Sequence, residues 1–201
     1  MGLNIGTILL AAGASRRLGQ PKQLLAIAGQ SLLRRSAEVA LGIGPGAAVV
    51  VLGSHHDLIA PELAGLPLQT VVNPEWATGM ASSLQVGLAA VLAQQPSTEA
   101  VLVLLCDQPF LGAEVLRNLV ATFGQTGSPI VASRYANGVL GVPILFSQQL
   151  FPELRLLTGD AGARKLLAQW PDLVQTIDFP EGLLDVDTPE DWARIQAQLN
   201  R

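Results

Sequence analysis

Apolar runs of strand length alternate with amphipathic segments along the whole chain. This alternation is typical of a mainly parallel sheet that is covered by helices, so it predicts an α/β fold. The runs are hydrophobic throughout rather than at every second residue, which indicates that both faces of the sheet are buried. The predicted strands cover residues 5–10, 47–52, 68–72, 100–106, 129–133 and 173–177.

Between these runs, apolar residues recur at the spacing of helices that pack one face against a sheet. The last helix has a clear start, because Thr188 stands in the N-cap position, Pro189 opens the first turn and Asp191 completes the spacing of a capping box. The apolar positions that define two crossover helices are Met80, Leu84, Leu88, Val91 and Leu92 in one, and Val115, Leu116, Leu119, Val120 and Phe123 in the other.

No internal repeat, low-complexity tract or Pro/Ser-rich linker divides the sequence. A length of 201 residues is close to that of one domain, so residues 1–201 are predicted to form a single domain. The region 134–159 is less regular, because Gly138, Gly141, Pro143 and Pro152 punctuate it. It is predicted to be an inserted section that faces the substrate.

Composition excludes several classes of protein. Hydrophobic residues make up 49% of the chain and charged residues only 14%, against a usual charged share of about 25%, which excludes disorder as the main state. The single Cys106 forms no intrachain disulfide, and the longest apolar run, residues 100–106, is far shorter than the ~20 residues of a membrane span. The first residues lack the basic start of a secretory signal, so we expect a cytoplasmic protein with no membrane partner.

The net charge of −4 argues against a nucleic-acid partner, because binding to a phosphate backbone usually needs a basic face. The distribution of charge is more informative. The charged residues among the first 35 are all basic, whereas the charged residues within 172–191 are all acidic. Two interpretations stay open at this point: two solvated surfaces, or a basic loop for a polyanion together with an acidic cluster for its metal.

The loop after the first strand, LAAGASRRLGQPK, combines small residues with cations. Small side chains allow backbone N–H groups to approach phosphate oxygens, and Arg17 and Lys22 can neutralise phosphate charge. The loop follows the carboxyl end of a strand, where open α/β sheets bind ligands. It matches neither G-x-x-x-x-G-K-[ST] nor G-x-G-x-x-G. An ordinary glycine-rich turn with solvated arginines is the alternative.

Carboxylates follow two other apolar segments. Asp107 stands at the carboxyl end of the predicted strand 100–106, and Asp185 and Asp187 precede the Thr188 cap. Mg²⁺ binds one or two carboxylates together with phosphate oxygens and water, so Asp107 and one of the later acids would suffice. The alternative for Asp107 is a turn or N-cap role before the next helix.

Taken together, these motifs resemble the MobA-like nucleotidyltransferases, and most closely the molybdenum cofactor cytidylyltransferases. The resemblance covers nearly the whole chain and implies a three-layer, Rossmann-like nucleotide-diphospho-sugar transferase fold with a mainly parallel central sheet. The stretches that carry it, in the order of the family, are LLAAGASRRLGQPKQLL, NPEWATGMASSLQVGL, LCDQP, GVP, GDAGAR and DVDTPED.

The resemblance implies a reaction and assigns residues to it. CMP would pass from CTP to the phosphate of molybdopterin, the organic part of the molybdenum cofactor, with release of pyrophosphate. Arg17 and Lys22 would stabilise the phosphates, Asp107 would bind Mg²⁺, and Asp187 is favoured over Asp185 as the second ligand of the metal. The implied nucleotide-binding residues are Leu10, Ala11, Ala12, Gly13 and Ser83.

Substrate choice rests on finer features. LAAG and CDQP side with CTP, whereas guanylyltransferase relatives tend to carry LAGG and an Asp-Lys pair at the position of Pro21 and Lys22. Recognition of the acceptor is expected to involve Gly141, Pro143, Asp160 and Arg164, the last on the acceptor phosphate. The alternative for the last two is that Asp160 caps a helix that runs to Ala168 and Arg164 is merely exposed.

Other functions remain as alternatives. These are GTP in place of CTP, a sugar phosphate as acceptor, a cofactor-binding module or chaperone without catalysis, and an NAD(P)-dependent reductase built on the same fold. A molybdoenzyme or its chaperone would be a further partner in the first interpretation.

Several conspicuous residues are assigned structural roles. His55 and His56 are adjacent and have no nearby Cys or His partner, so they are predicted to start a helix or lie in a loop rather than bind metal. Cys106 ends a hydrophobic run and is interpreted as packing. Residues 42–46 precede a strand and are predicted to end a helix.

Overall fold

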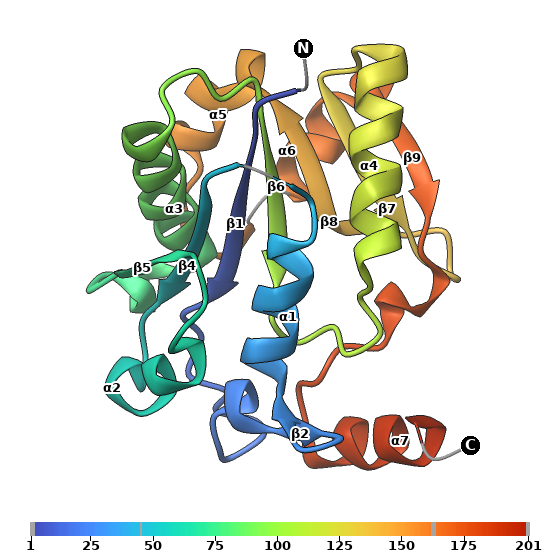
Figure 1. Ribbon diagram of the computed structural model, residues 1–201. Helices are drawn as coiled ribbons and strands as arrows, with labels where there is room; N and C mark the ends of the chain where they lie inside the picture. Colours follow the sequence, from blue (N-terminus) through green and yellow to red (C-terminus); the bar gives the residue numbers. More distant parts are fainter. Residues whose placement is uncertain (1–2, 45, 162–163, 200–201) are drawn as a thin grey trace.

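A seven-stranded sheet in the order β5-β4-β1-β6-β8-β7-β9 forms the middle layer of the molecule (Figure 1). The computed structural model describes residues 3–44, 46–161 and 164–199. Strand β8 runs antiparallel to its neighbours β6 and β7, whereas the other strands of the sheet are parallel to one another. The strands are β1 (Ile5–Ala11), β4 (Ala48–Leu52), β5 (Gln69–Val72), β6 (Ala100–Leu105), β7 (Ile130–Arg134), β8 (Leu140–Ser147) and β9 (Val174–Asp178).

The predicted strands are all present, and their ends differ from the predictions by one residue. Every residue of β1 and β4 is buried, as expected for strands that are covered on both faces. The continuous hydrophobicity of these segments therefore reflects their position in the centre of a layered α/β fold.

Strand β8 corrects the prediction of an inserted section over residues 134–159. Leu140–Ser147 instead joins the centre of the sheet between β6 and β7. Pro143 is tolerated because its partner strand β6 pairs only with residues from Ile144 onward, and the register with β7 is irregular beside Pro143. Glycine and proline therefore interrupted the sequence pattern without ending the strand.

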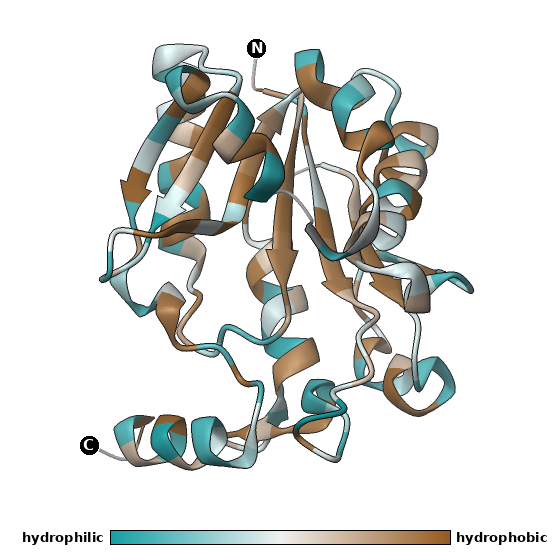
Figure 2. Ribbon diagram, turned by 180° about the vertical axis from the view of Figure 1, so that it is seen from behind, coloured by the Kyte–Doolittle hydropathy of each residue, from teal (hydrophilic) through white to brown (hydrophobic). Residues whose placement is uncertain are grey.

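Helices cover the sheet on both sides and complete the three predicted layers. One face packs against α3, α5 and α6, and the opposite face packs against α1 and α4. Figure 2 shows that apolar residues are concentrated on the strands and on the sides of the helices that meet them. The helices are α1 (Leu32–Leu41), α2 (His56–Ile59), α3 (Met80–Gln94), α4 (Ala113–Thr126), α5 (Phe151–Leu156), α6 (Arg164–Gln169) and α7 (Pro189–Leu199).

Helix α3 lies unusually close to β1. A Cβ atom built on Gly87 would stand 2.4 Å from Cγ2 of Ile8, so only glycine allows this approach. Leu84 and Leu88 on the same helix are buried against the sheet. This packing fixes the amino-terminal end of α3 beside the loop that leaves β1.

A small third core lies below the carboxyl edge of the sheet. Leu18 and Leu25 from the segment after β1 pack with Leu32, Val186 and Ile195, which brings α7 against the hairpin β2 (Ala26–Ile27) and β3 (Gln30–Ser31) (Figure 1). The loop after β1 and the segment before α7 are therefore joined by apolar packing. None of the described helices is long and apolar enough to cross a bilayer.

The order of the strands places a crevice at the carboxyl ends of β1 and β6. After β1 the chain crosses to β4 on one side, and after β6 it crosses toward β7 on the other side. Open α/β sheets bind ligands at such a reversal of direction, because the two diverging loops leave room between them.

Candidate active site

The loop after β1 is held in shape by Gln23, which is fully buried. Its side-chain Nε2 donates to the carbonyl oxygens of Ala11 at 2.9 Å and of Gly13 at 3.0 Å. Among the described residues, the backbone N–H groups of Gly13 and Ala14 donate no hydrogen bond to another backbone group. Gln23 therefore holds the carbonyl groups of the loop in place, while these two N–H groups stay available to an anion, as an anion site requires.

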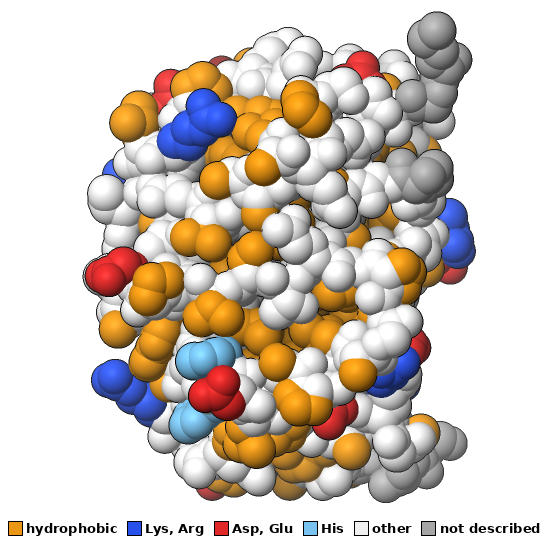
Figure 3. Space-filling model, turned by 60° about the vertical axis from the view of Figure 1, so that its left-hand side comes forward, with side chains coloured by type: hydrophobic (Ala, Val, Ile, Leu, Met, Phe, Trp, Pro, Cys, Tyr) orange, Lys and Arg blue, Asp and Glu red, His pale blue; other side chains and the backbone are white. Residues whose placement is uncertain are grey.

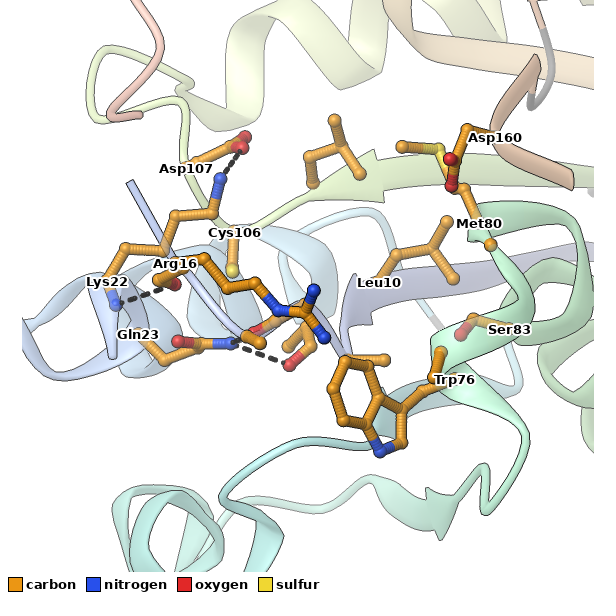
Figure 4. Close-up of a pocket in the computed structure, with 18 of the residues that line it drawn as sticks. Leu10, Arg16, Lys22, Gln23, Trp76, Met80, Ser83, Cys106, Asp107 and Asp160 are labelled. Carbon is orange, nitrogen blue, oxygen red and sulfur yellow. Dashed lines mark hydrogen bonds and ion pairs between the residues drawn. The ribbon is translucent and has the colours of Figure 1, made fainter. Parts of the chain in front are cut away.

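Four charged side chains meet at the end of this loop. The ammonium of Lys22 donates to Asp107 Oδ2 at 2.5 Å and to Asp187 Oδ1 at 3.2 Å, and the guanidinium of Arg17 donates to Asp187 Oδ2 at 2.7 Å. Residues far apart in the sequence therefore converge, as the nucleotidyltransferase interpretation requires. Figure 4 shows Lys22 reaching Asp107 at one end of the cavity.

Lys22 and Asp107 are mostly buried. Their side chains are 15% and 10% exposed, much less than the side chain of Arg17, which is 70% exposed. Burial alone would lower the pKa of Lys22, but the charges of Asp107 and Asp187 outweigh it, so the pKa is raised and the ammonium stays charged. The lysine therefore carries a permanent positive charge in the wall of the site.

The acidic segment is tied to the end of β6 by its backbone. The Val186 N–H donates to the carbonyl oxygen of Asp107 at 3.0 Å, and the side chain of Val186 is buried in the third core. On the other side, the predicted capping box is confirmed, because Thr188 and Asp191 exchange hydrogen bonds through their side chains and N–H groups. Asp187 is thereby held between two fixed points.

The amino-terminal end of α3 forms the opposite wall of the cavity. Asn73 Nδ2 donates to the hydroxyl oxygens of Ser82 at 2.9 Å and of Ser83 at 3.0 Å, which orients both hydroxyls. Gly79 begins this helix with φ of 119°, and a Cβ on it would stand 2.4 Å from the carbonyl carbon of Gly159. The backbone of α3 therefore touches the turn that carries Asp160.

Three adjoining hollows follow the carboxyl edge of the sheet. The first, of about 470 Å³, lies between the loop after β1 and α3 and contains the predicted nucleotide-binding residues (Figure 4). The second, of about 380 Å³, shares Lys22 and Asp107 with the first and adds Asp187 and Arg164. The third, of about 320 Å³, shares Asp107 and Arg164 with the second and extends to Tyr135.

The third hollow is supported by the side chain of Gln108. Its Nε2 lies 3.0 Å from the carbonyl oxygen of Val142 and 3.1 Å from that of Gly182, which fixes the orientation of the amide. Tyr135 donates its hydroxyl to the same Val142 oxygen at 2.6 Å. Burial raises the pKa of Tyr135, so the phenol keeps its proton.

The predicted acceptor residues are placed unequally. Asp160 lines the first two hollows and Arg164 lines the second and third. Gly141 and Pro143 are buried in β8, where Gly141 leaves room for the Tyr135 ring, and the residue between them, Val142, faces the third hollow.

Asp160 belongs to a 3₁₀ turn at Gly159–Ala161, and helix α6 is described over Arg164–Gln169. The alternative that Asp160 caps a helix running to Ala168 stays a prediction, because the start of such a helix falls between these two segments. Residues 162 and 163, which belong to the GDAGAR stretch, lie outside the described residues. Arg164 is exposed, as that alternative expected, yet it also lines two of the hollows.

The acids at this centre fit a divalent cation. Asp107 Oδ1 is buried and has no hydrogen-bond partner among the described residues, so one ligand oxygen is available. Mg²⁺ needs only one or two carboxylates when phosphate oxygens and water complete its coordination. The part of the chain that the structure describes contains no group of three or more His, Cys, Asp or Glu residues that could hold a metal by itself.

Residues that were assigned structural roles keep them. His56 opens α2, its Nδ1 lies 3.2 Å from the carbonyl oxygen of Gly53, and the two histidines are at the surface (Figure 3). Cys106 is buried, and burial together with the charge of Asp107 raises its pKa to about 12, so it is no thiolate nucleophile. Gly42 ends α1 as predicted.

Sequence reasoning missed several residues of the site. Gln23 holds the loop beside the first hollow and Gln108 supports the third, while Trp76 lines the first hollow and Tyr135 lines the third. Their signals were weak: each glutamine follows a charged residue of a recognised motif, and Trp76 lies inside the NPEWATG stretch. Tyr135 had no local signal, because its position depends on packing against Gly141 and against Gly182 from a distant segment.

Comparisons with known proteins show which family the chain resembles over most of its length. The model of the MobA-like NTP transferase domain matches residues 7–174. The nicotine blue oxidoreductase of Paenarthrobacter nicotinovorans is 36% identical over 196 residues, 94% of each chain. A probable molybdenum cofactor guanylyltransferase of Nostoc sp. is 28% identical over 205 residues, 98% of this chain and 93% of the relative.

Solved structures show the same fold. The crystal structure of Rv0371c from Mycobacterium tuberculosis matches with a TM-score of 0.84 and 33% identity, over 98% of this chain and 100% of that one. The same protein has a structure in complex with manganese, which matches with a TM-score of 0.79 and 31% identity over 96% of this chain and 97% of that one.

Proposed function

Because the chain belongs to the MobA-like NTP transferase family, we propose that it is a Mg²⁺-dependent cytidylyltransferase that transfers CMP from CTP to the molybdopterin of the molybdenum cofactor. The observation that carries the proposal is the meeting of Arg17, Lys22, Asp107 and Asp187 at a cavity beside a loop with free N–H donors. A polyanion with a bound cation complements such a group of charges.

The nucleotide occupies the first hollow in this proposal. The base lies near the hydroxyl of Ser83 and the backbone of Leu10, Ala11, Ala12 and Gly13, all of which line the hollow. The triphosphate then extends toward the cations Arg17 and Lys22. Free N–H groups of the loop take phosphate oxygens, which costs little reorganisation because Gln23 already holds the loop.

A divalent cation would be held by Asp107 and Asp187, where it supplies positive charge to the phosphates during transfer. The unpartnered Oδ1 of Asp107 supports this assignment over a purely structural one. The acceptor occupies the third hollow, and Arg164, at the junction of the second and third hollows, takes its phosphate. Asp160 lines both the first and the second hollow, so it lies between the proposed positions of the nucleotide and the acceptor.

The reaction needs no general base. An oxygen of the acceptor phosphate, already ionised, forms a bond to the α-phosphorus of CTP, and the bond from that phosphorus to the bridging oxygen breaks. Pyrophosphate leaves with that oxygen and its electron pair. The chain contributes by holding the two phosphates in line and by neutralising charge through Arg17 and Lys22, which are the main sources of catalysis in phosphoryl transfer.

Purified protein supplied with Mg²⁺, the molybdenum-bearing pterin and each NTP in turn tests the proposal. Pyrophosphate release is expected to be fastest with CTP, in agreement with the LAAG and CDQP stretches. Faster release with GTP would assign a guanylyltransferase instead. Binding of CTP without turnover would assign a cofactor-binding module or chaperone, with a molybdoenzyme as its partner.

A second candidate is an oxidoreductase, because a relative that is 36% identical over almost the whole chain is named as one. The four charged residues would have no evident task in hydride transfer. Oxidation of NADH or NADPH by the purified protein with a dye acceptor, and no pyrophosphate release with any NTP, would favour this candidate.

A further inference from the structure

The ammonium of Lys22 occupies the space between the two carboxylates that are proposed to hold the metal. It lies 2.5 Å from Asp107 Oδ2 and 3.2 Å from Asp187 Oδ1. Its position is not accidental, because Lys22 begins a 3₁₀ turn at Lys22–Leu24 and its own N–H donates to Ser15 Oγ at 3.1 Å. Lys22 is therefore anchored at its backbone while its ammonium links the acids.

Both oxygens of Asp187 are already in use. Lys22 takes Oδ1 and Arg17 takes Oδ2. A magnesium ion binds carboxylate oxygens at about 2.1 Å, so it cannot share the oxygens between the acids with an ammonium that stands where the ion would lie. Asp107 Oδ1 has no partner among the described residues, but a cation that also binds the oxygens facing the ammonium, Asp107 Oδ2 and Asp187 Oδ1, must displace Lys22 from them.

The charges of the four residues balance. Among themselves, the two cations pair with the two carboxylates and neutralise them, and a displaced ammonium would lose its partners at a largely buried position. A bound triphosphate changes both the charge balance and the supply of partners for the ammonium. It offers new acceptors to Lys22 and Arg17, and it brings negative charge that the carboxylates then share with the metal.

We propose that Lys22 keeps the metal site closed in the free protein and opens it when a nucleoside triphosphate binds, by moving its ammonium from Asp107 and Asp187 to the phosphates. The metal then enters with the nucleotide rather than before it. This inference rests on the proposed function, since it takes the triphosphate as the ligand of the first hollow. Lys22 acts as a placeholder for the metal as well as a phosphate ligand.

The test is binding of Mn²⁺ alone, measured by electron paramagnetic resonance of the free ion with no nucleotide and no acceptor. Replacing Lys22→Gln removes the competing charge and is expected to tighten binding of Mn²⁺ on the order of tenfold, equivalent to about 1.4 kcal/mol. The matched control is Lys165→Gln, which alters the other lysine of the chain, an exposed residue of α6, and should leave the affinity unchanged. Equal affinity in the wild-type protein and K22Q overturns the proposal.

Lys22→Arg serves as a second variant that keeps the charge beside Asp107. Its affinity for Mn²⁺ alone should stay close to that of the wild type, and an affinity as tight as that of K22Q contradicts a role for the charge. If K22Q does not fold, as judged by circular dichroism, Lys22→Met is measured against the same two predictions.

Addition of CTP separates this inference from the proposed function. If CTP tightens Mn²⁺ binding more in the wild type than in K22Q, the exchange by Lys22 is supported. If CTP tightens it equally in both, the exchange is wrong while nucleotide binding stands. If CTP has no effect on either protein, the proposed function fails and the exchange fails with it.

Discussion

The two sides of the cleft are built by different means. On the proposed nucleotide side, the loop after β1 and the start of α3 present backbone donors and small side chains directly after regular elements. On the proposed acceptor side, the third hollow depends on Tyr135, Gln108 and Val142, which come from separate segments and hold one another by side-chain hydrogen bonds. The first arrangement can be encoded by local sequence, whereas the shape of the third hollow depends on long-range packing.

Asp107 is a charged residue that lines both the first and the third hollow, and its loss should have the largest effect. Asp107→Ala removes the proposed metal ligand and the strongest partner of Lys22. Because removal of one such electrostatic group costs on the order of 10²–10³-fold, kcat/KM for pyrophosphate release is expected to fall at least that far. Circular dichroism should show an intact fold, and the exposed Asp172→Ala should keep full activity. Unchanged activity in the Asp107 variant would remove this residue from the mechanism.

Gly79→Ala tests whether the two sides are joined at the backbone. The new Cβ would stand 2.4 Å from the backbone of Gly159, and Gly79 has a φ of 119° that other residues rarely adopt. The expected loss in the free energy of unfolding is about 1–3 kcal/mol, measured by urea denaturation. Gly112→Ala is the control, because nothing lies within 4 Å of its Cβ position and its φ is −117°. Similar stability of both variants would mean that the contact yields easily.

Tyr135→Phe sharpens the comparison by altering the acceptor side alone. It removes the hydroxyl that donates to Val142 and accepts from Gln108, at a cost of about 1 kcal/mol in the free energy of unfolding. The KM for the acceptor should rise while the KM for CTP stays constant. A rise in both values would show that the two sides are coupled through this tyrosine.

The smallest effect concerns the dependence of stability on pH. Partial burial and the charges of Asp107 and Asp187 raise the pKa of Asp185 above its ordinary value of 3.8. The folded state therefore binds the proton more tightly than the unfolded state, and this group lowers stability as pH rises through its pKa. Asp185→Asn should slightly raise the melting temperature at pH 7, and the gain should vanish at a pH below 3.8. A gain that persists at low pH would point to packing instead of charge.

Much of the fold could be predicted from the sequence, because it rests on local patterns. Continuous apolar runs identified the parallel strands, and the spacing around Thr188 identified the start of α7. Strand β8 was missed since Gly141 and Pro143 normally break strands, and their tolerance depends on the Tyr135 ring and on where β6 stops pairing.

The candidate site likewise has features that the sequence predicts and features that depend on tertiary packing. The sequence singled out Arg17, Lys22, Asp107 and Asp187, and the structure brings them together. Only coordinates reveal that Lys22 stands between the two acids, because that position depends on the third core, which packs Val186 against Leu18. Their roles in binding and catalysis stay predictions.

The third core also determines when, during synthesis, the charged residues of the site can come together. Lys22 emerges from the ribosome early, and its partner Asp187 follows 165 residues later, after every strand of the sheet has been made. A chain that stops before Val186 has the loop and the sheet but lacks the contact of Val186 with Asp107 and those of Asp187 with Lys22 and Arg17. The cluster of Arg17, Lys22, Asp107 and Asp187 is therefore completed only near the end of synthesis, and truncated products lack it.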